Sequence, residues 1–155
     1  MQKQNKGKTL IELMIALLIF SSMMLGFYAL LNFVNTQSFL DTNRVDMQQQ
    51  ARNGMDRITR EVRESSSVAI TVVDANSDEL SFTTPNEVGI QYYRDGINLV
   101  REYPPDTTKI IASNILYLKF TQTGDLLQIQ IRADKILKSQ TISVLLTEKV
   151  RLRNE

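Results

Sequence analysis

The 155-residue sequence contains no cysteine and no histidine, and it has only three prolines and six glycines. Without cysteine the chain can form neither a disulfide nor a thiolate metal site. Without histidine it has no imidazole ligand and no nucleophile–histidine catalytic pair. A large excess of one charge is also absent, because 18 Lys and Arg side chains stand against 17 Asp and Glu. The composition therefore excludes disulfides, metal sites with cysteine or histidine ligands and nucleophile–histidine catalytic pairs. It also lacks the excess of basic residues that is typical of a nucleic-acid-binding surface.

The charges that are present are unevenly distributed. Lys3, Lys6 and Lys8 all precede a long apolar run. Once these three are set aside, the remainder has 15 basic against 17 acidic side chains, a net charge of −2. The length allows one domain with a modest core.

The apolar run, residues 10–34, reads LIELMIALLIFSSMMLGFYALLNFV, and Glu12 is its one charged residue. At 1.5 Å per residue, a helix of this length extends about 37 Å, more than the ~30 Å hydrocarbon layer of a bilayer. A helix of a soluble domain is seldom apolar on every face over such a length. The run therefore predicts a membrane span. Three lysines precede it and the first positive charge after it is Arg44, so the positive-inside rule places the N-terminus in the cytoplasm and the C-terminal domain outside.

Two other kinds of N-terminal segment share some of these features. A secretory signal peptide also has a positive start, but this run is too long and no small-residue cleavage site follows it. A plain single-span anchor fits the length but leaves Glu12 unexplained, since an ionised carboxylate near the bilayer core costs about 3 kcal/mol. Glu12 therefore needs a partner, unless its place two residues into the run keeps it at the membrane interface.

Residues 7–14, which read GKTLIELM, resemble the type IV prepilin N-terminal motif. That motif is a short basic leader ending in Gly, then a segment such as Phe-Thr-Leu-Ile-Glu-Leu, then a membrane-spanning helix. The resemblance implies that a prepilin peptidase cuts between Gly7 and Lys8 on the cytoplasmic face. It also implies that Thr9 and Glu12 act in subunit assembly, where the Glu12 carboxylate offsets the positive N-terminus of a neighbouring subunit. Burying such a pair costs far less than burying either charge alone.

One residue departs from that motif. The residue after the cut is normally Phe, often N-methylated, and here it is Lys8. Lys8 is the residue that N-methylation would modify, and whether it is modified stays open. A lysine there adds a second positive charge beside Glu12, which would either strengthen the pairing or change which neighbour is accepted.

Beyond the apolar run the sequence becomes polar without a helix breaker. Apolar residues recur at intervals of four, four, three and four, which places them on one face of a continuing helix. They are Met47, Ala51, Met55, Ile58 and Val62. This stripe is interpreted as the face that packs on a sheet or, alternatively, as a partner-binding surface. Gly54 is expected to weaken the helix by about 1 kcal/mol relative to Ala, and the helix is expected to end near 65–67.

After the three consecutive serines the pattern becomes that of strands. Short β-branched or alternating runs predict strands at 68–73, 79–83, 88–94, 97–103, 115–120 and 127–132. Asp95-Gly96, between two alternating runs, predicts a hairpin with a type I′ turn. Leu116, Leu118 and Phe120 are expected on one face of their strand. The last stretch, 140–152, mixes helical and strand patterns.

The carboxylates of the C-terminal part form no recognisable catalytic pair. Asp74, Asp78 and Glu79 fall in or beside a predicted turn and are interpreted as solvated loop charges. Asp106 and Asp125 are isolated in the sequence, so no calcium site is predicted. No Gly-rich phosphate loop occurs. We therefore expect neither an enzyme nor a cofactor.

A long helix followed by strands predicts an α+β fold in which the second half of the helix packs on an antiparallel sheet. Four segments are expected. They are a leader (1–7), a transmembrane assembly helix (8–34), its amphipathic continuation (35–66) and an extracytoplasmic β-sheet domain (67–155).

Residues 47–63, which read MQQQARNGMDRITREVR, resemble the corresponding helix of PilW-like minor pilins and J-type pseudopilins. Segments 90–93, 99–101, 114–120 and 150–154 resemble the C-terminal domain of the same group. The resemblance implies a minor pilin or pseudopilin of the bacterial inner membrane that helps to initiate or cap a type IV pilus or a type II secretion pseudopilus.

The resemblance also implies the partners. They are other pilins or pseudopilins, the prepilin peptidase, an inner-membrane assembly platform and the lipid bilayer; nucleic acid would be a partner only in a DNA-uptake pilus. The choice among these machines stays open, because their minor subunits share one architecture and fold does not fix function. The alternative is a membrane-anchored extracytoplasmic binding or sensing module with an uncleaved span.

Overall fold

A computed structural model of the chain describes residues 9–137 and 140–153. In this part of the chain one helix, α1 (Leu10–Val62), precedes eight strands. The strands are β1 (Val68–Val72), β2 (Asp78–Phe82), β3 (Ile90–Asp95), β4 (Asn98–Glu102), β5 (Thr108–Ser113), β6 (Ile115–Thr123), β7 (Leu126–Leu137) and β8 (Gln140–Arg151). The chain divides into two compact units, one ending at Asp41 and the other beginning at Thr42, so α1 contributes to both.

The first unit contains the apolar part of α1. Every side chain from Leu10 to Phe39 is exposed. Within the described ranges α1 is the one helix long and apolar enough to cross a membrane, and none of its apolar stretch is buried. A helix keeps all backbone hydrogen bonds within itself, so lipid can cover such a surface without leaving polar backbone groups unpaired. The predicted long apolar helix is therefore present, and its exposed apolar side chains from Leu10 to Val34 can meet lipid or other helices.

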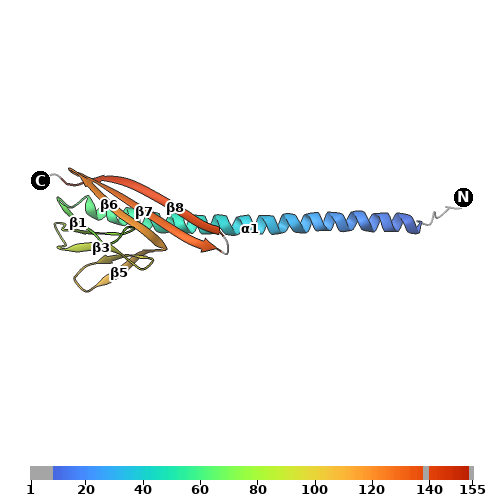
Figure 1. Cartoon of the computed structure of the whole chain (residues 1–155), viewed down its shortest axis with the longest axis horizontal. Helices are drawn as coiled ribbons and strands as arrows, with labels where there is room; N and C mark the ends of the chain where they lie inside the picture. Colours follow the sequence, from blue (N-terminus) through green and yellow to red (C-terminus); the bar gives the residue numbers. More distant parts are fainter. Residues whose placement is uncertain (1–8, 138–139, 154–155) are drawn as a thin grey trace. The chain divides into compact units, whose positions relative to one another are not determined.

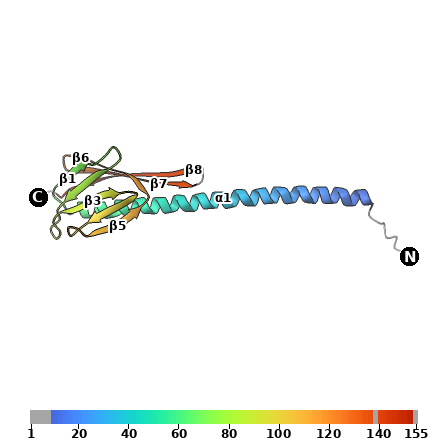
Figure 2. The same cartoon turned by 60° about the horizontal axis from the view of Figure 1, so that its bottom comes forward.

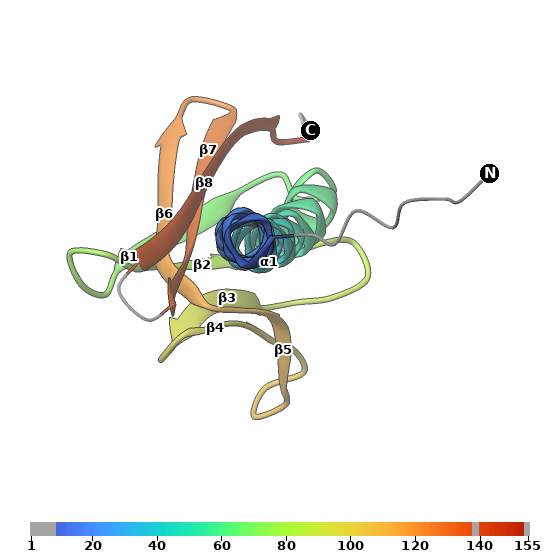
Figure 3. The same ribbon diagram turned by 90° about the vertical axis from the view of Figure 1, so that its right-hand side faces the viewer.

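In the second unit the remainder of α1 packs against two antiparallel sheets (Figure 1). Sheet A has the strand order β1-β2-β3-β4-β5 and sheet B has the order β6-β7-β8. Figure 3, which looks along α1, shows sheet B beside the helix and strands β3 to β5 of sheet A below it. All five residues of the predicted apolar stripe are buried between them. The α+β fold is thus confirmed, and the stripe is a core face.

Strands β7 and β8 form a long hairpin, paired from Leu126–Arg151 to Leu137–Gln140 (Figure 1). One face of β7 lies in the core through four alternating residues, Leu127, Ile129, Ile131 and Ala133. The alternation predicted for 127–132 is therefore present, in a strand twice as long as expected. The ambiguous stretch from 140 onward is its partner, and β8 forms one edge of sheet B.

The β3–β4 hairpin is present, but its turn differs from the predicted one. Asp95 pairs with Asn98, so the two loop residues are Gly96 and Ile97 rather than Asp95 and Gly96. Gly96 has a φ of +58°, whereas Asp95 and Ile97 do not have positive φ values. A glycine with positive φ at the first loop position is the arrangement of a type II′ turn. The type I′ prediction was wrong because the loop lies one residue further along the chain.

Two other strand predictions need correction. β5 was not predicted, and it forms the far edge of sheet A beyond β4 (Figure 2). Its Ser113 N–H donates to the Gln50 side chain of α1 at 3.0 Å, which occupies one donor of that edge.

In β6 the register shifts between Ile115 and Tyr117. This bulge puts Ile115 in the core and leaves Leu116 only half-buried, contrary to the expected face.

Gly54 is buried where α1 packs closely on both sheets. A Cβ atom on it would lie 2.6 Å from Leu99 Cδ2 in β4, 3.5 Å from Ile131 Cδ1 in β7 and 3.6 Å from Ala112 Cβ in β5. The first distance is well inside van der Waals contact, and Leu99 is fully buried. The expected helix-propensity loss of about 1 kcal/mol is therefore offset here by a close approach that a larger residue would obstruct.

Asp78 joins the two sheets. It is buried, and its carboxylate accepts a hydrogen bond from the Phe120 N–H of β6 at 3.1 Å and from Lys119 Nζ at 2.7 Å. Next to it, the Leu118 N–H donates to the Asn76 carbonyl at 2.9 Å. These contacts occupy donors along the edge of β6 that would otherwise be open to another strand. The interpretation of Asp78 as a solvated loop charge was wrong.

The carboxylate of Asp74 is an exposed loop charge, as expected. It accepts a hydrogen bond from the Asn76 backbone N–H at 2.6 Å and pairs with Arg94 at 3.0 Å. The Asn76 N–H, with further help from Ser77 and the charge of Arg94, lowers the pKa of Asp74 below its ordinary value.

A buried ionic cluster connects α1 to sheet A. Arg101 of β4 is 8% exposed; its Nε donates to Glu61 of α1 at 2.9 Å, and its other end pairs with Glu87. Arg57 also pairs with Glu61. The Arg101 guanidinium lies over the Tyr103 ring, 5.4 Å from its centroid. Burial by itself lowers the pKa of Arg101, but the hydrogen bond and charge of Glu61 outweigh it and hold the pKa above its ordinary value.

Tyr92 packs beside this cluster. It is fully buried, and its ring stacks on Phe82 with the centroids 6.1 Å apart. Its hydroxyl makes no hydrogen bond to any described residue. Burial, followed by the negative charge of Glu61, raises the pKa of Tyr92.

Candidate functional site

The first turn of α1 contains two of the predicted site residues, Thr9 and Glu12. The Thr9 backbone N–H donates to Glu12 Oε2 at 3.3 Å, and the Glu12 backbone N–H donates to Thr9 Oγ1 at 3.4 Å. Each side chain thus occupies a backbone donor of the other residue, which is the reciprocal pattern of a capping box. The helix begins at Leu10 because Thr9 is its N-cap.

This geometry fixes where the Glu12 charge lies. One carboxylate oxygen is turned back toward Thr9, at the positive end of the helix dipole, where a negative charge is favourable. The other oxygen makes no hydrogen bond to any residue within 9–137 or 140–153. The arrangement therefore presents a carboxylate at the start of an exposed apolar helix.

The other two predicted site residues, Gly7 and Lys8, lie outside the described residues. The predicted cut between them and the predicted modification of Lys8 therefore rest on the sequence.

The two serine hydroxyls in the apolar part of α1 are hydrogen-bonded within the helix. Ser21 Oγ donates to the Leu17 carbonyl at 2.7 Å, and Ser22 Oγ donates to the Ile19 carbonyl at 2.8 Å. Such bonds to the preceding turn remove the need for water at a polar side chain. The polar interruptions in the run are therefore compatible with a lipid or protein surrounding.

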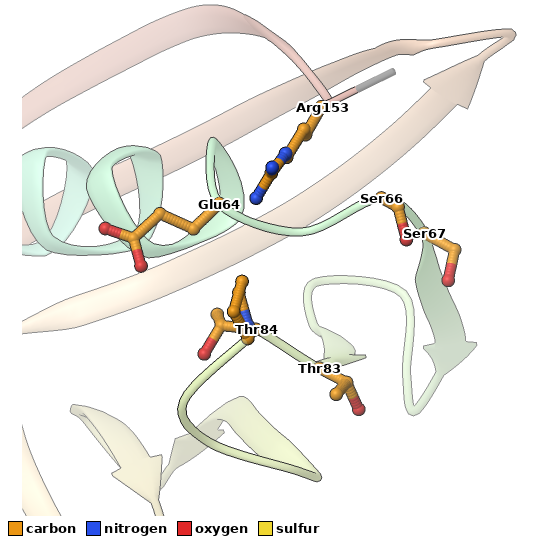
Figure 4. Close-up of a pocket in the computed structure, with 7 residues that line it drawn as sticks. Glu64, Ser66, Ser67, Thr83, Thr84 and Arg153 are labelled. Atoms are coloured by element: carbon orange, nitrogen blue, oxygen red, sulfur yellow. The ribbon is translucent and has the colours of Figure 1, made fainter. Parts of the chain in front are cut away.

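A hollow of about 440 Å³ lies beyond the C-terminal end of α1 (Figure 4). Its lining residues are Glu64, Ser66, Ser67, Thr83, Thr84, Pro85 and Arg153. In Figure 4 the Arg153 side chain points toward the hollow, whereas the Glu64 side chain extends back along the helix. Of the lining hydroxyls, Thr84 Oγ1 donates to the Glu87 backbone carbonyl at 3.4 Å, and Thr83 Oγ1 accepts from the Gly89 N–H at 3.4 Å.

The described residues contain no group of three or more His, Cys, Asp or Glu side chains arranged to hold a metal ion. Asp125 instead pairs with Arg151 at 2.7 Å. The Asp106 backbone N–H donates to Glu102 Oε1 at 3.2 Å.

Comparison with known protein families gives one match. Residues 2–28 match the model of the prokaryotic N-terminal methylation motif. No curated protein and no solved structure matches the chain. The chain thus carries a type IV pilin-like prepilin signal, and the matched segment includes all four predicted site residues, Gly7, Lys8, Thr9 and Glu12. Such a signal suggests a structural, membrane-anchored protein that meets other pilins and a prepilin peptidase.

Sequence reasoning found Glu12 through its charge in an apolar run, but it did not predict the bond to Thr9. The signal was present, because Thr9-Leu10-Ile11-Glu12 has the Thr-x-x-Glu spacing of a capping box before an apolar run. Glu12 therefore has a structural role at the helix start in addition to any role in assembly.

Proposed function

We propose that this chain is a minor pilin or pseudopilin, a structural subunit that helps to initiate or cap a type IV pilus or a type II secretion pseudopilus. The proposal rests above all on the Glu12 carboxylate at the start of a fully exposed apolar helix, within a matched prepilin signal. A carboxylate in that place can pair with the positive N-terminus of a neighbouring helix once lipid and water are excluded.

The minor-subunit assignment is supported by the second half of α1. Residues 47–63 resemble PilW-like and J-type proteins, and in the second unit they form a helix whose apolar stripe lies under two antiparallel sheets. In the proposed topology, residues 1–7 are a leader and 8–34 cross the inner membrane. The polar helix (35–66) and the β domain (67–155) follow outside the cytoplasm, where they join the fibre.

One observation favours a second candidate, a membrane-anchored extracytoplasmic binding or sensing module with an uncleaved span. The capping box gives Glu12 a reason to be present in a plain anchor, because it starts the helix without any second subunit. The hollow beside Arg153 would then be the place to look for a ligand.

Gly7→Val distinguishes the two candidates. In cells that contain a prepilin peptidase, we expect wild-type chain to lose its seven-residue leader and the variant to keep it, because the enzyme requires the small residue before the cut. Gel mobility of the membrane fraction measures this, with Gln2→Ala in the same leader as the control. Equal sizes for wild type and Gly7→Val would favour the uncleaved module.

A further inference from the structure

The outer edge of β8 is the longest open strand edge in the described part of the chain. β8 has 12 residues, whereas the other edge strands, β1, β5 and β6, have 5, 6 and 9. On one side β8 pairs with β7 over its whole length; on the other its backbone makes no hydrogen bond to any residue within 9–137 or 140–153. Alternate residues of a strand turn their N–H and C=O groups to opposite sides, so half of these groups in β8 have no strand beside them.

The neighbouring edges are partly occupied, and β8 has none of the usual protection. Asn76 and Asp78 occupy donors of β6, and Gln50 occupies one donor of β5. Charged residues, proline and bulges also discourage pairing at an edge. From Gln140 to Thr147, β8 reads QTISVLLT, without charge or proline, and its register with β7 is continuous. An uncharged segment of this kind favours the addition of another strand.

A hollow of about 270 Å³ lies beside this edge. Its lining residues are Arg52, Met55 and Asp56 of α1 and Leu146, Thr147 and Glu148 of β8. No residue of β7 is among them, so the hollow is on the open side of β8. Met55 is buried and Leu146 is half-buried, which gives the hollow an apolar part. A strand added to β8 would turn every second side chain toward α1 and the hollow.

The charges around the hollow balance. Arg52 and Asp56 have opposite signs, and Glu148 lies 3.8 Å from Arg63. Neither an acidic nor a basic segment is therefore favoured over an uncharged one.

We propose that the β8 edge and this hollow together bind an extended segment of another protein, which adds to sheet B as a fourth strand. The unpaired N–H and C=O groups of β8 suit an extended backbone, because a helix uses its own backbone groups internally. Main-chain hydrogen bonds would supply the affinity, and the hollow would select one side chain. The segment is uncharged and alternating, with an apolar side chain placed against Met55 and Leu146.

A second copy's β8 is not this segment. β8 runs in the same direction as α1 in the second unit, because residues 146–148 lie beside 52–56 and the Arg153 N–H donates to the Ser65 carbonyl further on. Two β8 edges related by a two-fold axis would pair antiparallel, so their helices would run in opposite directions. Copies inserted in one membrane in the same direction cannot meet in this way. This exclusion rests on the proposed function, but the site itself does not depend on cleavage of the leader.

Hydrogen exchange of the full chain in detergent micelles tests the site. The probe is the uncharged peptide Ser-Thr-Val-Thr-Leu-Thr-Val-Thr-Ser at millimolar concentration. We expect it to slow exchange of the backbone amides between 141 and 147 by about tenfold, whereas the amides of β1 to β5 keep their rates. The same peptide with proline in place of both valines is the matched control. It should have no effect, because proline lacks the N–H and resists pairing in a sheet.

Closing the hollow tests its part in the site. Asp56→Phe puts a large side chain at the rim of the hollow, and we expect about tenfold more peptide to be needed for half of the effect. Asn53→Phe is the control, because Asn53 is exposed on the same helix and does not line the hollow. Both replaced residues are exposed, so both variants should fold like wild type.

Four results would overturn the proposal. They are unchanged exchange of 141–147 with the peptide, equal slowing by the proline peptide, equal slowing in both sheets, and the same response from Asp56→Phe as from Asn53→Phe. Protection of 141–147 that appears without peptide and grows with protein concentration would mean that a second copy covers the edge, which also contradicts it. A chain that is cut after Gly7 but does not bind the peptide would refute the site and leave the proposed function standing. A chain that binds the peptide without being cut would do the reverse.

Discussion

Glu12→Gln and Glu12→Ala should each insert into the membrane like wild type and reach the fibre at about a tenth of the wild-type level or less. The physical reason is charge, because a neutral side chain cannot offset the ammonium group of a neighbouring N-terminus within a lipid-excluded helix bundle, where unpaired charge costs several kcal/mol. Insertion should persist because removing one carboxylate makes the apolar helix easier to insert. Alkaline extraction of membranes measures insertion, and the amount of chain in sheared fibres measures incorporation.

The glutamine variant separates the two roles that the structure gives to Glu12. Gln can still complete a capping box with Thr9, since Glu and Gln both serve at that position, but it has no charge. Thr9→Ala is the companion variant, because it removes one half of the capping box, leaves the Glu12 carboxylate and so measures what the helix start alone contributes to assembly. We expect Thr9→Ala to assemble far better than Glu12→Gln. Wild-type incorporation of Glu12→Gln would show that Glu12 serves the helix start and not subunit pairing.

Arg101→Ala should destabilise the second unit by about 3 kcal/mol, the usual size of the loss when one partner of a buried ion pair is removed. Arg101 is 8% exposed and holds two carboxylates, Glu61 from α1 and Glu87 from the loop before β3. Without it, Glu61 retains only Arg57 and faces the raised-pKa hydroxyl of Tyr92. Thermal unfolding of the full chain in detergent micelles, followed by circular dichroism, should show a Tm lower by roughly 10–20 °C.

Two companion variants make this result specific. Arg60→Ala removes an exposed arginine from the same helix and should change the free energy of unfolding by less than about 0.5 kcal/mol. Arg101→Lys keeps one charge but not the forked guanidinium, so it should lie between wild type and Arg101→Ala. A Tm for Arg101→Ala within a degree or two of wild type would mean that the cluster does not hold α1 to sheet A.

The helix and the general fold follow from local sequence signals. The apolar run and the stripe from Met47 to Val62 have helical spacing and no breaker, so α1 could be predicted over nearly its whole length. Alternation in β7 was equally clear, because its core side lies under α1 and its other side is wet. The helix, its apolar stripe and the alternation in β7 are all periodic patterns of apolar residues, and such patterns can be read from a single sequence.

The features that sequence reasoning missed depend on contacts between distant segments. Asp78 resembles a loop charge until β6 brings the Phe120 N–H and Lys119 to it. From the sequence, Gly54 is expected only to weaken the helix, because the sequence does not show that Leu99 packs against it. Nothing in the sequence around Arg101 distinguishes it from the other arginines, because its partner Glu61 lies forty residues earlier in the chain. The turn at Gly96-Ile97 was missed for a local reason, since the strand register and not the Asp-Gly pair decided which residues form the loop.

The site at the start of α1 was predicted in part. Glu12 was identified because a charge in an apolar run is costly, and Thr9 was identified by resemblance alone. The structure adds the reciprocal hydrogen bonds that turn the Glu12 carboxylate toward Thr9. It also shows that Glu12 would be a sensible residue in an uncleaved anchor, which is why the charge-neutral Gln variant is a stronger test than Ala.

The proposed function depends most directly on cleavage between Gly7 and Lys8. Intact mass of the chain extracted from the membranes of cells that contain a prepilin peptidase measures it, with peptidase-deficient cells as the control. The proposed function predicts a mature chain that runs from Lys8 to Glu155 in the first cells and an uncut chain from Met1 to Glu155 in the second. An uncut Met1–Glu155 chain in both would contradict it.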